Sequence, residues 1–395
     1  MPMILFKNLK LVDSDFKGQQ PKMAFVVNNG IIQWIGSQNK VPKEYKIKKS
    51  VDLKNKLVFP SFIECHTHSV FAGSRAEEFE LRNQGISYLE IAQKGGGILS
   101  TMRATRQAPA NELLRLTQER VDNFLKQGVS TLEIKSGYAL DLKNEVKMLE
   151  ILKKIKGPQI ISTFLGAHAR PPEFSDNADY LQYLSTQVLP VIKKKNLSKR
   201  VDIFIENKFF EKPESLVYLQ SAIDQGFEIT IHANQLSLSA GAELALELAA
   251  KSADHVIHLD DFLIHQFAKS NTVAVLLPTA DLYMKCAYPP ARKLIDAGAL
   301  VALATDYNPG SSPSQDLSLV GLLARLEMKM TLPEVFKAYT YNAARALGLE
   351  NREGSLEVGK NANFICTNAE LNDFFYSAGR MPEHSLFIRG REIKS

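Results

Sequence analysis

Residues 111–134, "NELLRLTQERVDNFLKQGVSTLEI", contain one complete helix-to-strand unit. Apolar residues recur through 111–127 at a spacing of about 3.6 residues, which predicts an amphipathic helix capped by Asn111 and ended by Gly128. The apolar run at 129–134 follows at once and predicts a buried strand.

The same alternation of strand and helix runs through the middle of the chain. The expected strands are 57–64, 129–134, 159–165, 201–206, 227–232, 254–258, 272–278 and 300–306. Eight parallel strands with helical crossovers predict an α/β fold of the TIM-type (β/α)8 class, over about 59–352. A doubly wound sheet fits less well, because no G-x-G-x-x-G follows a strand and the glycine run at 94–98 lacks the P-loop lysine.

The two chain ends have a different pattern. The stretch 23–36, "MAFVVNNGIIQWIG", predicts a hairpin with Asn29-Gly30 at its bend. Strand-like runs with turn residues between them return near the C-terminus. We expect 1–58 and 353–395 to pair into one small β-sandwich domain.

Composition excludes several classes of protein. A net charge of +5 over 395 residues, with scattered lysines, argues against nucleic-acid binding. Three cysteines without a C-x-x-C favour a reducing compartment. No apolar run approaches the roughly 18 residues of a membrane span. We expect a cytoplasmic protein with a small-molecule substrate and no membrane partner; a homodimer is compatible with the sequence.

Metal-binding residue types lie at the ends of the expected strands. These residues are His66, His68, His168, His232, His255 and Asp306. The carboxyl ends of barrel strands share one face, so these side chains are expected to converge there. Three imidazoles and a carboxylate suit a borderline ion such as Zn²⁺ or Fe²⁺.

Each of these residues also has an ordinary structural explanation. A single buried histidine is more often a hydrogen-bonded core residue than a ligand, and Asp306 in "TDYNPGSSP" is a good turn former. Their joint placement at strand ends favours a metal site. Lys135 at the end of its strand suggests a carbamate bridging two metals, but a lysine extending to solvent is commoner. His258 and His265 are expected to be structural or surface residues.

Other polar residues after the strands suit a substrate with a carboxylate. Arg75 offers a bidentate guanidinium, and Tyr138 a hydroxyl donor. Asn308, Ser311 and nearby backbone N–H groups follow Asp306 and suit the same kind of ligand.

Four blocks of the sequence occur in a specific order: "GGGI" at 95–98, "KSGY" at 135–138, "FLGAH" at 164–168 and "ATDYNPG" at 304–310. With the residues above, these blocks resemble the metal-dependent amidohydrolases and, within them, the imidazolonepropionase family of histidine degradation. The resemblance extends over most of the chain, whereas the His-x-His pair is shared by the whole superfamily.

The resemblance implies a set of roles. One Zn²⁺ or iron ion would be bound by His66, His68, His232 and Asp306. Substrate would contact Arg75, Tyr138, His168, Gln235 and Ser311, with Asn308 and Gly310 near the product. The implied reaction is the opening of 4-imidazolone-5-propanoate to N-formimidoyl-L-glutamate by a metal-activated water. Asp306 would accept a proton, His255 would orient the water or shuttle the proton, and Gln235 would assist catalysis.

The chain departs from the family at three positions. Asn234 replaces a usual acid, Ala139 a usual glycine and Glu64 a more familiar Asp. Asn234 is expected nearest the metal and to affect rate or pH optimum. Two alternatives stay open: a related deaminase or cyclic-amide hydrolase acting on another heterocycle, and a non-catalytic metal-dependent binding protein.

Overall fold

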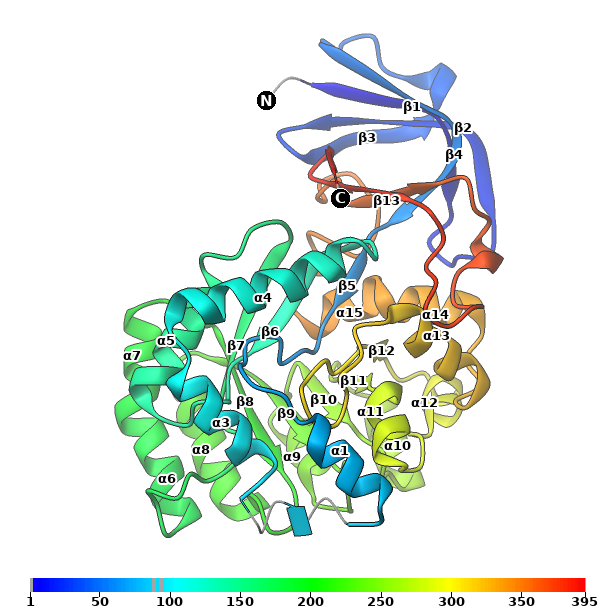
Figure 1. Cartoon of the computed structure of the whole chain (residues 1–395). Helices are drawn as coiled ribbons and strands as arrows, with labels where there is room; N and C mark the ends of the chain where they lie inside the picture. Colours follow the sequence, from blue (N-terminus) through cyan, green and yellow to red (C-terminus); the bar gives the residue numbers. More distant parts are fainter. Residues whose placement is uncertain (1–2, 87–89, 92–94, 395) are drawn as a thin grey trace.

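The computed structural model describes residues 3–86, 90–91 and 95–394, which form a barrel with a separate sheet beside it (Figure 1). Eight parallel strands lie side by side in chain order. They are β5 (Phe62–Glu64), β6 (Val129–Lys135), β7 (Gln159–Ala167), β8 (Arg200–Ile205), β9 (Glu228–Ala233), β10 (Ser252–His255), β11 (Val273–Leu276) and β12 (Val301–Leu303). A parallel bridge between Thr67 and Tyr307 joins the first strand's end to the last, which closes the barrel. The predicted (β/α)8 fold is confirmed.

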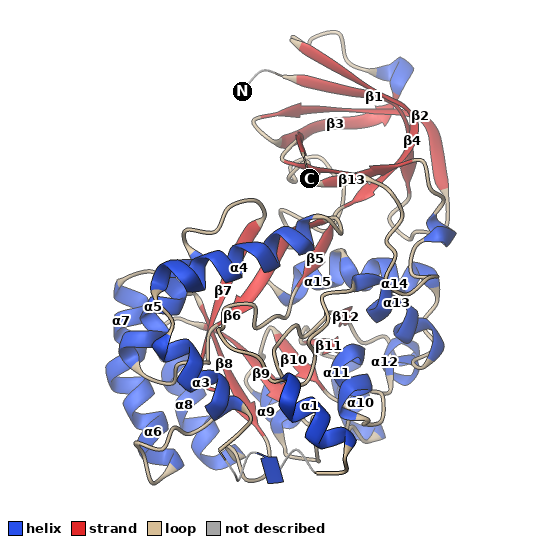
Figure 2. Cartoon of the chain, in the orientation of Figure 1, coloured by secondary structure: helices blue, strands red, loops and turns tan. Residues whose placement is uncertain are grey.

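Helices cover the outside of the barrel strands (Figure 2). The α-helices are α1 (Ala76–Asn83), α3 (Ile98–Gln107), α4 (Ala110–Leu125), α5 (Leu142–Leu152), α6 (Asn177–Tyr183), α7 (Leu189–Lys194), α8 (Lys212–Asp224), α9 (Gly241–Glu247), α10 (Asp261–Ala268), α11 (Pro278–Met284), α12 (Ala291–Ala297), α13 (Leu317–Leu326), α14 (Leu332–Tyr339) and α15 (Tyr341–Ala346). The structure also has a π-helical turn, η2 (Leu184–Val188), and two 3₁₀ turns, η1 (Gln38–Lys40) and η3 (Leu371–Asp373).

Helix α4 shows how the pattern produces a crossover. Leu113, Val121 and Phe124 are buried on one face, as the spacing predicts. Gly128 has a φ of 88°, a left-handed value that ends the helix and turns the chain into β6. The predicted Asn111 cap is wrong, because the helix already begins at Ala110. Pro109 takes the extended N-cap position, for which its fixed φ is suited.

Two predicted strands have different bounds in the structure. The run 57–64 divides between two sheets: β4 (Lys49–Pro60) belongs to the small sheet and only β5 to the barrel. The strand expected at 254–258 ends at His255, where φ is 75°, so the chain leaves the extended conformation there.

The small sheet contains strands from both chain ends. Its order is β15-β14-β13-β4-β1-β2-β3. The strands not yet given are β1 (Ile4–Val12), β2 (Gln19–Asn28), β3 (Ile31–Ser37), β13 (Phe364–Thr367), β14 (Ser385–Ile388) and β15 (Arg391–Ile393). The predicted hairpin is confirmed, with Asn28 opposite Ile31. The rings of Phe6 and Phe387 lie 5.7 Å apart although their strands are not neighbours, so this single sheet curls around its own aromatic core.

Two further observations concern the helices and the cysteines. Across the described part of the chain, no helix combines the length and the apolarity that crossing a bilayer requires. Cys65, Cys286 and Cys366 are all free, as the expectation of no disulfide framework requires.

Candidate active site

Four of the predicted metal ligands meet at the carboxyl ends of the barrel strands. Oδ1 of Asp306 lies 3.3 Å from Nε2 of His66 and 3.3 Å from Nε2 of His68. Nε2 of His232 lies 3.4 Å from Nε2 of His68. Nε2 of His66 and Oδ1 of Asp306 are fully buried and make no hydrogen bond within the described residues. Buried nitrogen and oxygen atoms that face one another without a hydrogen-bond partner are suited to bind a cation between them.

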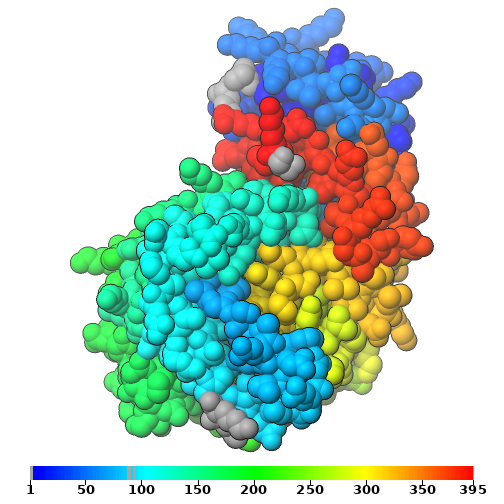
Figure 3. Space-filling model, viewed as in Figure 1, coloured from blue at the N-terminus to red at the C-terminus, as the bar shows by residue number. Residues whose placement is uncertain are grey.

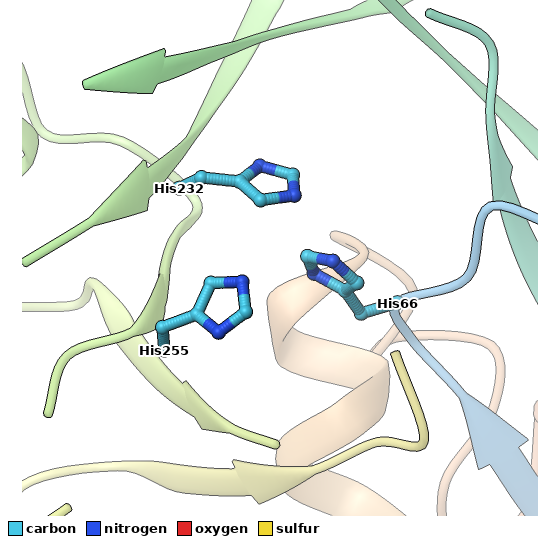
Figure 4. Close-up of side chains that lie close together, drawn as sticks. All are labelled: His66, His232 and His255. Atoms are coloured by element: carbon cyan, nitrogen blue, oxygen red, sulfur yellow. The ribbon is translucent and has the colours of Figure 1, made fainter. Parts of the chain in front are cut away.

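His255 also lies within ligand distance. The nitrogen atoms of His66, His232 and His255 form one group that can hold an ion, and those of His66 and His68 form a second with Asp306. Figure 4 shows His66, His232 and His255 reaching toward one another, His66 from the segment after β5 and the other two from the ends of β9 and β10. The geometry therefore brings together five candidate donors, with His66 shared by both groups.

Carboxylates support the two central histidines from behind. Nδ1 of His66 lies 2.6 Å from Oδ2 of Asp254, and Nδ1 of His232 lies 3.0 Å from Oδ2 of Asp202. A proton held on Nδ1 leaves the Nε2 lone pair directed at the candidate metal position, the arrangement usual for metal-binding histidines.

Lys135 is buried among these carboxylates, so the expectation that it extends to solvent is wrong. Its Nζ lies 2.8 Å from Asp202, 2.9 Å from Glu133 and 3.4 Å from Asp254. Burial lowers the pKa of Lys135, but the carboxylates of Asp202, Glu133 and Asp254 outweigh it and raise the pKa overall. The ammonium group therefore stays charged and offsets part of the negative charge of the buried acids.

Burial sets the protonation of the histidines that lack a carboxylate behind them. It lowers the pKa of His68 to about 4 and that of His255 to about 3, so both are neutral at neutral pH. At His66, burial and Lys135 act to lower the pKa, but Asp254 and Asp306 raise it to about 9. In the metal-free state this imidazole is protonated.

The strand ends that carry these residues have left-handed backbone. The φ angle is 51° at Asn234, 75° at His255 and 52° at Asp306. Such angles are costly for residues other than glycine and concentrate at functional sites, where the surrounding structure imposes them.

Glu64 joins the two strands that carry the first and last ligands. Its carboxylate accepts hydrogen bonds from the backbone N–H of His66 at 3.2 Å and of Thr305 at 3.1 Å. Burial raises the pKa of Glu64 to about 8. A shorter Asp would have to reach the same two donors from farther away, which gives the Glu at this position a structural reason.

The predicted substrate residues line one cavity beside the candidate metal position. Those lining it are Arg75, Tyr138, His168, Gln235, Asn308 and Ser311, together with His68, His232, His255 and Asp306. Sequence reasoning did not identify the other lining residues, which are Ile98, Phe204, Leu236 and Met284. His66 lies behind this wall with no exposed surface.

Two of the predicted residues, Asn308 and Gly310, affect the structure of the loop after β12. The Asn308 side chain donates to Asp306 O at 2.7 Å and accepts from Gly310 N at 2.8 Å, so it organises its own loop. Gly310 does not line this cavity. A Cβ there would lie 2.0 Å from Nη1 of Arg75, so a side chain at this position would displace the guanidinium from where it lies.

Tyr138 and His168 stand together at the side of His68. The rings of His68 and His168 are stacked with centroids 5.2 Å apart, and Tyr138 lies 5.2 Å from His168. Buried Glu145 holds the loop that carries Tyr138 by accepting from the N–H groups of Gly137 and Ala139. Ala139 does not have a positive φ, so alanine in place of the usual glycine adds no backbone strain.

Asn234 does not point into the cavity. Its Nδ2 donates to His258 O at 2.9 Å, and its Oδ1 accepts from Ala242 N at 3.0 Å. The side chain thus ties the end of β9 to α9, and the geometry gives no direct route from Asn234 to catalysis.

The supporting charges behind the histidines escaped sequence analysis. Glu133, Asp202 and Asp254 are ionisable residues inside short apolar strands, and each has at most 1% of its surface exposed. An ionisable residue inside an apolar strand was the feature of the sequence that could have identified them, because a charge in a fully buried strand requires a partner.

The sequence matches a known family and curated relatives over most of its length. Residues 57–393 match the Amidohydrolase family. An imidazolonepropionase from Bdellovibrio bacteriovorus is 55% identical over 94% of this chain and 88% of its own. One from Fusobacterium nucleatum is 42% identical over 93% of this chain and 90% of its own.

Solved structures share the fold at low identity. An adenosine deaminase from Xanthomonas campestris with bound zinc matches with a TM-score of 0.76 and 17% identity, over 98% of this chain and 92% of that one. A guanine deaminase from C. acetobutylicum with bound guanine has a TM-score of 0.73 and 16% identity, over 99% of this chain and 100% of that one. The chain belongs to the amidohydrolase family and, within it, to the imidazolonepropionase family.

Proposed function

We propose that this protein hydrolyses 4-imidazolone-5-propanoate to N-formimidoyl-L-glutamate. The observation that carries the proposal is one cavity lined both by metal-type donors and by Arg75, a partner for a carboxylate. Its relatives at 55% and 42% identity bear the name imidazolonepropionase, which agrees with this substrate.

We assign one divalent Zn²⁺ or iron ion to His66, His68, His232 and Asp306. The unpartnered buried atoms of His66 and Asp306 support this set. Such an ion acts as a Lewis acid and lowers the pKa of bound water toward about 7. His255 is assigned to the reacting water and its proton, although its ring also lies within ligand distance.

The protein's own groups supply proton transfer and orientation. Oδ2 of Asp306, which lies 3.5 Å from Ser311 Oγ on the cavity side, accepts the proton of the attacking water. The neutral His255 imidazole accepts a hydrogen bond from the same water and orients it. Gln235, half-buried in the cavity wall, donates its amide N–H to the ring carbonyl of the substrate.

The substrate is held at both ends. Arg75 grips the propionate with two parallel N–H donors, while Tyr138 and His168 pack beside the ring. Asn308, Gly310 and Ser311 form the loop on the product side. Fixing both ends presents the ring carbonyl to the water in one orientation.

We also propose domain bounds and a cellular location for this protein. The barrel is assigned to about 59–352 and the small domain to 1–58 with 353–395, where the boundary strand β4 continues in the small sheet to Pro60. The three free cysteines support a cytoplasmic location.

A product assay on several substrates tests the proposal. Freshly prepared 4-imidazolone-5-propanoate should be consumed with formation of N-formimidoyl-L-glutamate, and a panel of purines and pterins should release no ammonia. Ammonia release from a purine or pterin, with no ring opening of the imidazolone, would replace the proposal with a deaminase.

A further inference from the structure

Helix α1 places one carboxylate between two parts of the cavity wall. Oε2 of Glu78 accepts from Nε of Arg75 at 2.7 Å, and its Oε1 accepts from the backbone N–H of Gly97 at 2.9 Å. The Glu78 side chain is 15% exposed and that of Arg75 only 4%, so this bridge is largely removed from solvent. Each carboxylate oxygen therefore has a different donor.

The second donor belongs to the glycine run that no part of the proposed reaction uses. Gly97 has φ 68° and ψ −142°, a conformation available to glycine, and it is the N-cap of α3. A Cβ at Gly96 would lie 3.1 Å from Glu78 Oε1, so this segment packs closely on the carboxylate. Ile98, the next residue after Gly97, lines the cavity. Glu78 thus holds the segment that presents Ile98 to the substrate.

The other side of the Arg75 guanidinium is held by the loop after β12. Gly310 packs against Nη1 of Arg75, and its carbonyl accepts from Nη2 of Arg82 at 3.0 Å. Arg82 lies one turn beyond Glu78 on α1 and also donates to Tyr283 O. Figure 3 shows the surface of α1, in blue, beside the yellow surface of the loop after β12. Helix α1 therefore fixes Arg75 between Glu78 and Gly310.

We propose that Glu78 is a positioning residue that orients the Arg75 guanidinium toward the carboxylate of the substrate and joins it to the segment that carries Ile98. The inference rests on the proposed function, because it assumes an anionic group bound at Arg75. Fixing Nε by Glu78 defines the plane in which the remaining N–H donors lie, and a bidentate contact requires that plane. Glu78 should therefore affect how tightly a substrate with a carboxylate binds and should have little effect on the rate of the chemical step.

A purely electrostatic role predicts the opposite sign. If Glu78 only neutralised Arg75, removing its charge would strengthen the attraction between Arg75 and an anionic substrate, and KM would fall. If Glu78 positions Arg75, the same change raises KM. Glu78→Gln separates the two, because an amide has a single acceptor oxygen and cannot serve both Arg75 and Gly97.

Steady-state kinetics of Glu78→Gln test the inference, with Glu77→Gln as the matched control. Glu77 is exposed on the same helix, so the control removes the same charge without touching the bridge. We expect KM for 4-imidazolone-5-propanoate to rise about tenfold in Glu78→Gln, with kcat changed less than about threefold, and no change in Glu77→Gln. Glu78→Asp, which keeps two acceptor oxygens, should recover part of the loss. An unchanged or lower KM in folded, metal-loaded Glu78→Gln overturns the inference.

Ligand binding gives a readout that does not depend on turnover. Imidazole-4-propanoate and 4-ethylimidazole share the ring and the two-carbon chain and differ in the carboxylate, so the ratio of their dissociation constants by calorimetry isolates the carboxylate contact. Glu78→Gln should reduce this preference about tenfold relative to Glu77→Gln. If the wild-type protein opens the imidazolone ring but the ratio of dissociation constants is unchanged in Glu78→Gln, the inference about Glu78 is overturned and the proposed function stands. A reduced ratio in a protein that opens no imidazolone supports the inference and removes the proposed function.

Discussion

Nδ1 of His66 and Oδ2 of Asp254 lie 2.6 Å apart, and both side chains are buried. This contact directs the other nitrogen of His66 at Asp306. The same acid lies 3.4 Å from the Lys135 ammonium, so one lysine connects the barrel interior to the candidate metal position. The orientation of the proposed ligands therefore depends on charges that never reach the cavity.

Alanine at a proposed ligand should remove metal and turnover together. His232→Ala takes away one imidazole of the set, and we expect metal analysis of the purified variant to find none bound. His255→Gln is the comparison: it should keep the metal while kcat falls by about 10²- to 10⁴-fold, as for loss of a proton-transfer group. Full metal content in His232→Ala would contradict the assignment of His232 as a ligand. Metal loss in His255→Gln would show that His255 is a ligand.

Lys135→Met should destabilise the fold. The change leaves Glu133, Asp202 and Asp254 buried without their cation, and loss of one partner from a buried ion network costs about 3–5 kcal/mol. Urea unfolding of both proteins measures the difference.

Lys195→Met is the control for this change. Lys195 pairs with Glu150 at 2.8 Å, but both side chains are about half exposed, so the expected loss is below about 1 kcal/mol. Equal losses in the two variants would show that the Lys135 network adds nothing to stability.

Arg75→Lys should weaken substrate binding more than it slows the reaction. Lysine keeps the charge but is a point donor, so the bidentate fork is lost and KM is expected to rise about tenfold or more. Steady-state kinetics with 4-imidazolone-5-propanoate measure this effect. If KM is unchanged, Arg75 does not bind the propionate.

Asn234→Asp should lower stability and should not raise kcat. The carboxylate cannot donate to His258 O, and two acceptors would then face each other in a buried position, which costs about 1–3 kcal/mol. Thermal unfolding and kcat are measured on the same preparations. A faster enzyme of unchanged stability would support the expectation from the sequence that the residue at this position affects the rate.

Metal loading should strengthen as pH rises. In the metal-free protein the pKa of His66 is raised to about 9, so below that pH a proton occupies the imidazole and must leave before Nε2 binds an ion. Apparent affinity should fall about tenfold for each unit between pH 9 and pH 6, measured by competition with a chelator whose own pH dependence is known. An affinity independent of pH over this range would mean that His66 loses no proton on binding.

Periodicity predicted the barrel because its signal is local. Each crossover repeats a helical face such as Leu113 and Val121 followed by a short apolar strand, and strand count then limits the topology. The end of β10 was misplaced because the chain turns at His255, whose φ of 75° is imposed by tertiary contacts rather than by propensity.

The candidate site could be predicted only in part. Histidines at strand ends were visible because the barrel brings those ends together. The burial of Lys135 was missed, because a lysine at a strand end normally extends to water and its three partners lie on three different strands. Glu78 was not singled out: its spacing from Arg75 is only that of an ordinary helical pair, and its second donor, Gly97, meets it only in the folded protein.

Product analysis of freshly prepared 4-imidazolone-5-propanoate, incubated with purified protein of measured metal content, tests the proposed reaction. We expect N-formimidoyl-L-glutamate as the product, one metal ion per chain, and loss of both in His66→Ala. Protein that carries one metal ion per chain and leaves the imidazolone ring intact would contradict the proposed reaction.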